Sequence, residues 1–414
     1  MNQSKQVEII KELLGHIDNK RTVDAGRILV NPTSSYTDAA LAQREWEAFF
    51  QQHPQVLGMS GELPTPGSYL TMNDFGVPIL ATRDEHGQFH AFVNACRHRG
   101  AELTQQARGE KQRFSCPFHG WTYASNGRLL GVRQADQFGK IDKNCSSLVE
   151  LPSAEKYGLL FVHPQVDGKL DVDALLGKEM AAEMAAWELD RCVYEGESVL
   201  DMPLNWKIAN DTFGEVYHFN SLHTNTLANL MHGDASTYTE FGRHHRLCLA
   251  SKYIDQMRTQ PEENWSLPHA GAIAYYLFPN IQLVILTSMV VLVRIYPNRK
   301  IVGQSLSRVS HYSAPQIRSL VPPDAQVNAV NSENVYDAAN TTAHMDFDVT
   351  ALLELFVSTV EHEDYLMGTK TQSAANSGKI DHFLFGRNEP ALHHFHNNYR
   401  SALGMPPLEE YRAG

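Results

Sequence analysis

The sequence predicts an α+β protein with two domains, of which the first is all-β and the second combines an antiparallel sheet with helices. A chain of 414 residues is long enough for two substantial cores. Short alternating segments around residues 89–93, 113–123 and 157–164 indicate strands in the first part. The most apolar run, residues 272–297, predicts adjacent strands in the second part, and residues 348–372 have helical spacing.

The charge of the chain limits its possible partners. The formal net charge is −12 at pH 7, and no cluster of Lys and Arg is present, so we expect no nucleic-acid partner. The N-terminal segment MNQSKQVEIIKELLGHIDNK is charged and amphipathic, unlike an apolar signal, and no apolar run approaches the length of a membrane span. We therefore expect a cytoplasmic protein without a membrane partner.

Two mixed pairs of cysteine and histidine form the most informative motif. Cys96 and His98 lie in CRH, Cys116 and His119 lie in CPFH, and seventeen residues separate the pairs. Two thiolates and two imidazoles are the ligand set of a Rieske [2Fe–2S] cluster, and the same set can hold tetrahedral zinc. Zinc fingers place both cysteines in one pair, whereas each pair here is mixed, which favours iron.

The residues around these pairs resemble the Rieske domain of ring-hydroxylating oxygenase large (alpha) subunits. Its signature, C-X-H-R-G followed by C-X-Y/F-H-G-W, is complete here and includes Arg99, Gly100, Gly120 and Trp121. The resemblance implies that Cys96, His98, Cys116 and His119 hold one [2Fe–2S] cluster. The remaining thiols, Cys145, Cys192 and Cys248, have no disulfide-like spacing, and we expect them to be buried and reduced.

A second group of candidate ligands lies in residues 204–223. His218 and His223 are five residues apart, which on a regular helix turns the second side chain about 140° from the first. Both can reach one metal only if the helix widens or ends there, and two ordinary histidines are the alternative. The segment resembles the alpha-subunit motif at Asn205, Trp206, Lys207, Glu215, Tyr217, His218 and His223. The resemblance implies a mononuclear non-heme Fe(II) held by both histidines and one distant aspartate.

The predicted helix beginning at Asp348 contains the candidates for the third ligand. It resembles the family's E-D helix, with Gln372 following, and this register implies Asp364 as the iron ligand. The alternatives nearby are Glu361, His362 and Glu363, which otherwise belong to a solvated helix face. The later histidines, His393, His394 and His396, are expected to be structural.

The resemblance also implies a fold, domain boundaries and an assembly. We expect an N-terminal helical arm at 1–44, the Rieske domain at 45–165 and a helix-grip, START-like catalytic domain at 166–414. In the family, the cluster of one subunit faces the iron of its neighbour in a trimer, so we expect α3 or α3β3. Glu215 occupies the position of the acid that bridges a cluster histidine to an iron histidine.

The implied function is that of a terminal oxygenase that uses O2 and electrons from NAD(P)H to hydroxylate a small substrate, by mono- or dioxygenation. The chain has no Gly-rich dinucleotide motif, so a flavin-containing reductase, with or without a ferredoxin, must oxidise NAD(P)H. We rank an aromatic substrate first, with Arg294 as a candidate partner for a substrate carboxylate. The alternatives are a quaternary ammonium substrate caged by Tyr275, Tyr276 and Phe278, and an electron carrier without oxygenase activity.

Overall fold

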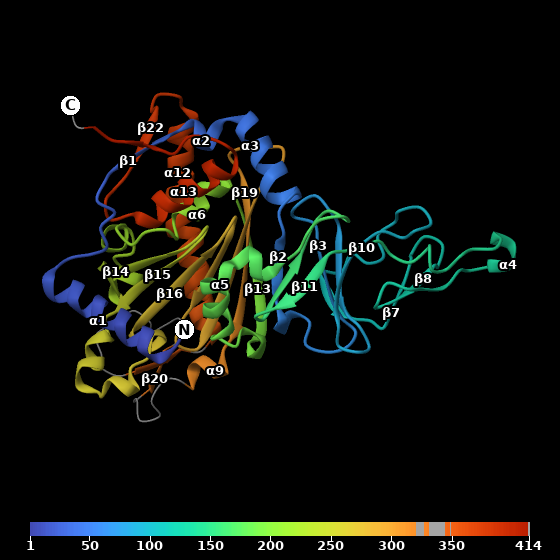
Figure 1. The fold of residues 1–414 in the computed structure, drawn as a ribbon, viewed down its shortest axis with the longest axis horizontal. Helices are drawn as coiled ribbons and strands as arrows, with labels where there is room; N and C mark the ends of the chain where they lie inside the picture. Colours follow the sequence, from blue (N-terminus) through green and yellow to red (C-terminus); the bar gives the residue numbers. More distant parts are fainter. Residues whose placement is uncertain (320–326, 331–343, 348, 413–414) are drawn as a thin grey trace. The chain divides into compact units, whose positions relative to one another are not determined.

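The computed structural model describes residues 1–319, 327–330, 344–347 and 349–412 (Figure 1). The chain folds into two compact units: the larger contains residues 1–45, 176–187 and 194–414, and the smaller contains residues 46–175 and 188–193. The domain boundaries expected from the sequence stay predictions. The helical segment at the N-terminus packs within the larger unit, where α1 (Gln3–Asn19) contacts the strand β14 (Met231–Phe241).

The regular structure of the smaller unit is mostly antiparallel strands, which form three sheets. Their orders are β10-β5-β4-β3-β6, β11-β12-β2 and β7-β8-β9. The strands are β2 (Gln55–Met59), β3 (Ser68–Met72), β4 (Ile79–Arg83), β5 (Phe89–Val93), β6 (Arg108–Glu110), β7 (Arg113–Ser115), β8 (Thr122–Ala124), β9 (Leu129–Gly131), β10 (Glu150–Leu151), β11 (Ser153–Lys156) and β12 (Leu159–Val162). The short helix α4 (Ala135–Phe138) follows β9.

A seven-stranded sheet forms the centre of the larger unit, in the order β13-β19-β18-β17-β16-β15-β14. The pairs from β19 to β14 are antiparallel, as predicted. The apolar run at residues 272–297 forms three of these strands, with chain reversals at residues 278–280 and 286–288. The remaining strands of this sheet are β13 (Val193–Met202), β15 (His244–Ser251), β16 (Gly271–Leu277), β17 (Ile281–Ile285), β18 (Met289–Pro297) and β19 (Ser305–Ser313).

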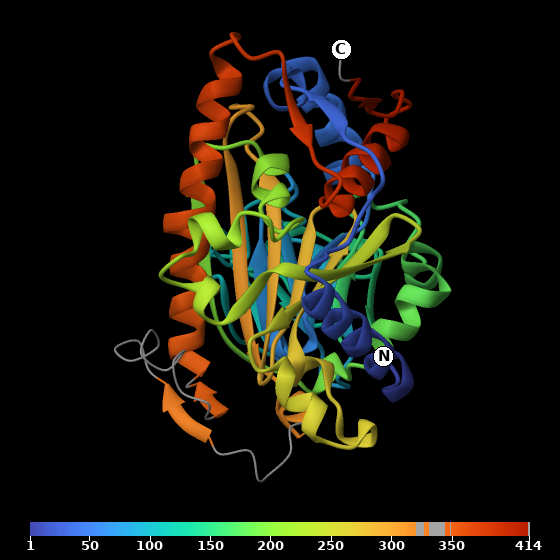
Figure 2. The same ribbon diagram turned by 90° about the vertical axis from the view of Figure 1, so that its left-hand side faces the viewer.

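A long helical segment runs along the sheet of the larger unit (Figure 2). It consists of α11 (Val349–Thr359), one π-helical turn η7 (Val360–Asp364) and α12 (Tyr365–Asn376). The helix α6 (Trp206–Asp211) contacts β18, β19 and α12, so it lies between the sheet and this segment. No helix in the described part of the chain has the length and apolar character that crossing a bilayer requires.

Other elements complete the larger unit. A three-stranded sheet has the order β22-β1-β23, and β20 and β21 form a parallel pair. The bounds are β1 (Leu29–Pro32), α2 (Ser34–Thr37), α3 (Ala39–Glu45), α5 (Val172–Ala185), α7 (Phe219–Leu222), α8 (Leu267–Ala270), α9 (Pro315–Arg318), β20 (Val327–Val330), β21 (His344–Phe347), β22 (His382–Phe385), α13 (Pro390–Ala402) and β23 (Glu409–Glu410).

A buried ion pair holds α6 in place. The Lys207 ammonium lies 2.6 Å from Oε1 of Glu45 in α3, and both side chains are 1% exposed. The Trp206 indole N–H also donates to this carboxylate, at 3.0 Å. Removing one partner would leave a buried charge uncompensated, which typically costs about 3–5 kcal/mol. The first residues of the N-W-K motif therefore anchor the helix that precedes the candidate iron ligands.

Candidate metal centres

The two Cys/His loops of the smaller unit have the same backbone turn. The Gly100 N–H donates to the carbonyl of Cys96 at 2.8 Å, and the Gly120 N–H donates to that of Cys116 at 3.0 Å. Both glycines have positive φ angles, +74° and +73°, which side chains with a Cβ rarely adopt. The glycines of the motif thus allow two equivalent tight loops to present one thiol and one imidazole each.

The two candidate thiols lie in the hydrophobic core of this unit, and the two candidate imidazoles lie next to each other. Cys96 and Cys116 belong to the core and are 3% and 4% exposed, whereas both imidazoles are half-buried. Nδ1 of His98 lies 3.1 Å from Nδ1 of His119. Burial, together with the neighbouring Cys116 thiol, raises the pKa of Cys96. Two adjacent buried thiols beside two adjacent imidazoles fit the donor set of a Rieske cluster.

Two aromatic residues support this arrangement. The His98 ring stacks on the Trp121 indole with 5.2 Å between centroids. The Tyr123 hydroxyl lies 3.3 Å from Sγ of Cys96 and accepts the backbone N–H of Arg97 at 3.0 Å. Because the Tyr123 oxygen already accepts one hydrogen bond, its own proton is available to the Cys96 sulfur.

In the larger unit, a break in helical structure brings His218 and His223 together. The helix α6 ends at Asp211, and the four-residue helix α7 has His218 as its N-cap and His223 as its C-cap. The helix therefore ends at this point, as one of the two predicted solutions requires. Asp364 is the last residue of the π-helical turn η7, which widens the long helix where its carboxylate faces both imidazoles.

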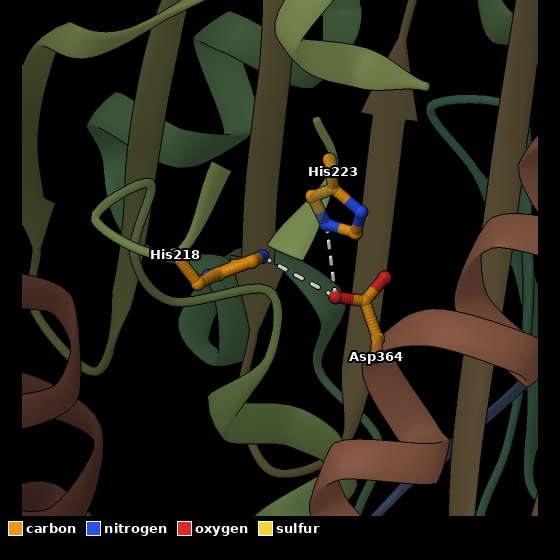
Figure 3. Close-up of side chains that lie close together, drawn as sticks. All are labelled: His218, His223 and Asp364. Carbon is orange, nitrogen blue, oxygen red and sulfur yellow. Dashed lines mark ion pairs between the residues drawn. The ribbon is translucent and has the colours of Figure 1, made fainter. Parts of the chain in front are cut away.

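The three side chains converge on one point (Figure 3). Oδ1 of Asp364 lies 3.2 Å from Nε2 of His218 and 3.2 Å from Nε2 of His223. One possible ligand atom of each residue lies within 4.8 Å of the others, and this is the one such group of three or more found in the described residues. Nε2 of His223 is buried and makes no hydrogen bond. Two imidazoles and a carboxylate that meet in this way fit the facial set of a non-heme Fe(II).

A glutamate contacts the Nδ1 atom of each imidazole, while the other ring nitrogen, Nε2, faces Asp364. Glu215 bonds Nδ1 of His218 and also accepts its backbone N–H at 3.1 Å. Glu363 lies 2.7 Å from Nδ1 of His223 and accepts the Thr226 hydroxyl at 2.9 Å. Such carboxylates place the proton on Nδ1 and direct the Nε2 lone pair toward the metal.

The charges at the centre favour protonated imidazoles when no metal is bound. Burial opposes the charge on His218, but Asp364 and Glu215 raise its pKa to about 10. For His223, Asp364 and Glu363 likewise raise the pKa against the effect of burial. Burial acts to raise the pKa of Asp364, and the two imidazoles outweigh it and lower the pKa. A divalent cation would replace these protons.

A partly enclosed cavity of about 150 Å³ adjoins the three residues. Its wall is mostly apolar because alternate residues of β15, β16 and β17 face it. The lining residues are Thr212, Phe213, Glu215, His218, Phe219, His223, Leu227, Met231, Leu247, Leu249, Ala272, Ala274, Val284, Leu286, Phe356, Thr359, Val360 and Asp364. An apolar cavity of about this volume, engineered in another protein, binds benzene.

An open cleft of about 790 Å³ shares lining residues with this cavity. Glu215, His218 and Asp364 line both the cleft and the enclosed cavity. The cleft wall also contains apolar side chains from α12, α13 and β22, including Met367, Leu392 and Leu384, the last of which is 48% exposed. Two of the three candidate ligands, His218 and Asp364, therefore line both the open cleft and the more enclosed cavity.

Several residues considered from the sequence lie elsewhere. Arg294 is fully buried and bonded to Glu197, so it is not positioned to bind a substrate carboxylate. Tyr275 faces away from the cavity and bonds Glu183 at 2.6 Å. The Tyr276 hydroxyl donates to the Pro279 carbonyl at 2.7 Å, and neither tyrosine nor Phe278 lines the cavity. These three aromatic residues therefore belong to the core and do not form an ammonium cage at this cavity.

The other histidine and cysteine predictions have mixed outcomes. Nε2 of His396 lies 2.8 Å from Asp211, and Nδ1 of His394 lies 3.1 Å from that of His245. Nε2 of His393 lies 3.2 Å from the carbonyl of Phe385, so all three C-terminal histidines have partners in the protein. Cys192 and Cys248 are buried, but Cys145 is exposed, contrary to expectation.

Sequence reasoning missed the role of Glu363. The sequence suggests that Glu363 is either an alternative iron ligand to Asp364 or part of a solvated helix face. In the structure, its carboxylate lies within hydrogen-bonding distance of Nδ1 of His223. The sequence signal for this role is the pair of adjacent acids, Glu363 and Asp364. On a widened turn, one carboxylate can bind the metal while its neighbour bonds a ligand histidine.

Comparisons with known proteins agree with this geometry. The ring-hydroxylating alpha subunit (catalytic domain) model matches residues 189–405, and the Rieske [2Fe–2S] domain model matches residues 53–152. The chain is 33% identical over 203 residues to a glycine betaine monooxygenase oxygenase subunit of Chromohalobacter salexigens, covering 49% of this chain and 45% of the relative. It is 30% identical over 204 residues to an anthranilate 1,2-dioxygenase large subunit of Acinetobacter baylyi, covering 48% and 43%.

A solved quaternary ammonium Rieske monooxygenase in complex with L-carnitine has the same fold. The TM-score is 0.71 at 19% identity, over 91% of this chain and 96% of that one. The chain belongs to the ring-hydroxylating alpha-subunit family. The predicted fold class is thereby confirmed, and the two domains imply a Rieske [2Fe–2S] cluster and a mononuclear iron. The sequence matches span about half of this chain and less than half of the two relatives.

Proposed function

We propose that this protein is the terminal oxygenase of a multicomponent system, which uses O2 and electrons originating from NAD(P)H to hydroxylate a small apolar substrate. The observation that supports this most is the presence of two different ligand sets in one chain, one for an electron-relaying cluster and one for an iron with open positions. An electron carrier would have no use for the convergence of His218, His223 and Asp364 beside an enclosed cavity.

The proposed cluster ligands are Cys96, His98, Cys116 and His119, and the proposed iron ligands are His218, His223 and Asp364. When bound, the cluster supplies single electrons and the iron supplies a site where O2 is activated beside the substrate. Glu215 and Glu363 fix the tautomers of the two histidines. The apolar cavity wall excludes water and holds the substrate near the three ligands.

Electrons enter, in this proposal, from the cluster of a neighbouring subunit in a trimer. Phe118, beside His119, is 60% exposed, so the surface next to the cluster histidines presents an apolar side chain together with the exposed Arg97 and Arg99. The open cleft behind Glu215 and His218 is also largely apolar. These surfaces are complementary in character, and Glu215 would connect the neighbour's cluster to His218. A flavin-containing reductase, with or without a ferredoxin, would reduce the cluster.

Mixing two inactive variants tests the assembly. Cys116→Ser removes a cluster ligand, and Asp364→Ala removes an iron ligand. If electrons cross between subunits, trimers formed by refolding or co-expressing both variants should recover part of the activity, because some contain an intact cluster facing an intact iron. Activity that never exceeds the sum of the separate variants would contradict transfer between subunits, provided that mixed trimers are present by mass.

An aromatic compound remains the first candidate substrate, because the cavity is apolar and of benzene-like volume. A quaternary ammonium compound is the second candidate, because one relative is a glycine betaine monooxygenase oxygenase subunit. The test is to supply a reductase, NADH, O2 and a panel of single-ring aromatics and trimethylammonium compounds, and to identify the products. Oxygenated product with matched O2 consumption supports the proposal, whereas NADH-driven O2 loss without any product across both classes contradicts it.

A further inference from the structure

One hydroxyl in the wall of the enclosed cavity has no partner in the protein. Thr359, the last residue of α11, is 3% exposed and lines the cavity, and its Oγ1 is buried without a hydrogen bond. Threonine in a helix commonly bonds a carbonyl three or four residues earlier. Thr359 makes no such bond to the described residues and no capping bond to the π-helical turn that follows it.

The other polar groups of the described wall are already engaged. The Thr212 hydroxyl donates to the Ala209 carbonyl at 2.9 Å. Glu215 bonds His218, and Asp364 faces both imidazoles. Of the two hydroxyl groups among the described lining residues, Thr359 is therefore the one that makes no hydrogen bond. A buried hydroxyl without a partner is unfavourable, so a ligand that satisfies it gains affinity.

We propose that Thr359 is a substrate-positioning residue, and that the substrate is an uncharged single-ring molecule with one hydroxyl, carbonyl or amide substituent. This inference rests on the proposed function for the role of the cavity. Thr359 and Asp364 are five residues apart on one helical segment, which places them roughly 6–8 Å apart along its axis. A substituted ring spans a comparable length, so its substituent can reach Thr359 while the opposite ring edge lies near the metal ligands.

The charge of the cavity favours an uncharged ligand. None of the described lining residues is Lys or Arg, so a substrate carboxylate at the Thr359 end of the cavity would be buried without a cationic side chain as partner. A trimethylammonium group has neither a donor nor an acceptor, so it cannot satisfy Thr359. The inference therefore separates this protein from the relative named for glycine betaine, although both belong to the same family.

The test is binding of the isosteric pair phenol and toluene to the holoenzyme, measured by calorimetry without reductase. The wild type should bind phenol about 3–10-fold more tightly than toluene, the factor expected for one neutral hydrogen bond. Thr359→Val, which removes only the hydroxyl, should abolish or reverse this preference, because the phenol hydroxyl would then be buried without a partner. Thr359→Ser should retain the preference.

Thr212→Val is the matched control, because it makes the same chemical change in the same wall at a hydroxyl that is already bonded. It should leave the phenol-to-toluene ratio unchanged. If Thr359→Val is unstable, Thr359→Ala replaces it, and iron content is measured in every variant. An unchanged ratio in the Thr359 variants, or tighter binding of glycine betaine or benzoate than of phenol, overturns the inference. Because binding needs no turnover, the result is independent of whether the proposed oxygenase reaction is found.

Discussion

Oε2 of Glu363 lies 2.7 Å from Nδ1 of His223, and the next residue, Asp364, faces Nε2 of the same imidazole at 3.2 Å. One π-helical turn thus supplies two carboxylates: Glu363 bonds Nδ1 of this histidine, and Asp364 completes the proposed ligand set. Glu215 holds His218 in the same way. The two glutamates come from different parts of the chain, yet they give both histidines the same tautomer.

Replacing Glu363 by Ala should weaken iron binding, because Nδ1 of the buried His223 loses its partner. Loss of such a supporting carboxylate typically costs about 10–100-fold in metal affinity. The measurement is competition for iron with a chelator of known affinity, and the visible absorption of the cluster should not change. Glu361→Ala is the control, because Glu361 lies on the same turn without a hydrogen bond to either imidazole. Equal iron affinity in both variants would show that Glu363 does not support His223.

Replacing Glu215 by Gln should retain both metal centres but reduce turnover by about 10-fold or more. The two bonds to His218 use different carboxylate oxygens, so the single amide oxygen can still accept from Nδ1 and keep the ligand in place, but the bond to the backbone N–H and the negative charge are lost. The measurement combines iron content, the cluster spectrum and product formed per NADH. Full activity with normal coupling would rule out a role for this carboxylate in electron transfer.

Replacing Tyr123 by Phe should lower the reduction potential of the cluster. The Tyr123 hydroxyl lies 3.3 Å from Sγ of Cys96, and a hydrogen bond to a ligand sulfur stabilises the reduced, more negative state. A bond of about 1 kcal/mol corresponds to roughly 40 mV for one electron. A spectroelectrochemical titration measures the shift. Tyr69→Phe is the control, because that hydroxyl bonds Gln106 in the same unit; equal potentials in both variants would exclude the Tyr123 bond.

The buried pair of His245 and His394 should make stability fall in mild acid. Burial, with His394 and His244 nearby, lowers the pKa of His245 well below 6.5. The native state therefore stays neutral at a pH where the unfolded chain binds a proton, and stability present above pH 6.5 is lost as the pH falls. The expected slope from this residue is about 1.4 kcal/mol per pH unit.

His245→Phe should reduce this slope of the unfolding free energy below pH 6.5 by about one proton, as measured by denaturant titrations of the metal-free protein at several pH values. His86→Phe is the control, because His86 is exposed in the smaller unit. If both variants keep the slope of the wild type, the proposed titration of His245 is incorrect.

The ligand motifs could be predicted from the sequence, because they depend on residue type and spacing. Which face of its strand a residue occupies could not be predicted in the apolar strands. The Cys/His loops and the N-W-K segment have local signals, and the three proposed iron ligands converge in the structure. Tyr275 and Arg294 lie in an apolar run without alternation, so the sequence does not show which face each occupies. Their partly buried acidic partners, Glu183 and Glu197, lie about 90–100 positions away in the sequence.

Glu363 and Thr359 illustrate the same limit on one helix. On a regular helix, the side chains of Thr359 and Glu363 would point away from the direction of Asp364, and Glu363 would be a surface residue. The π-helical turn widens the helix and changes these directions. No pattern in the sequence announces that turn.

Iron and acid-labile sulfide per chain, measured in the wild type and in Asp364→Ala, test the central claim most directly. The account predicts three irons and two sulfides in the wild type, since the cluster holds two irons and the facial set one. Asp364→Ala should keep two irons, two sulfides and the cluster spectrum, while losing the third iron. A wild type that contains only zinc or only the cluster iron, or an Asp364→Ala variant with unchanged iron, would contradict the account.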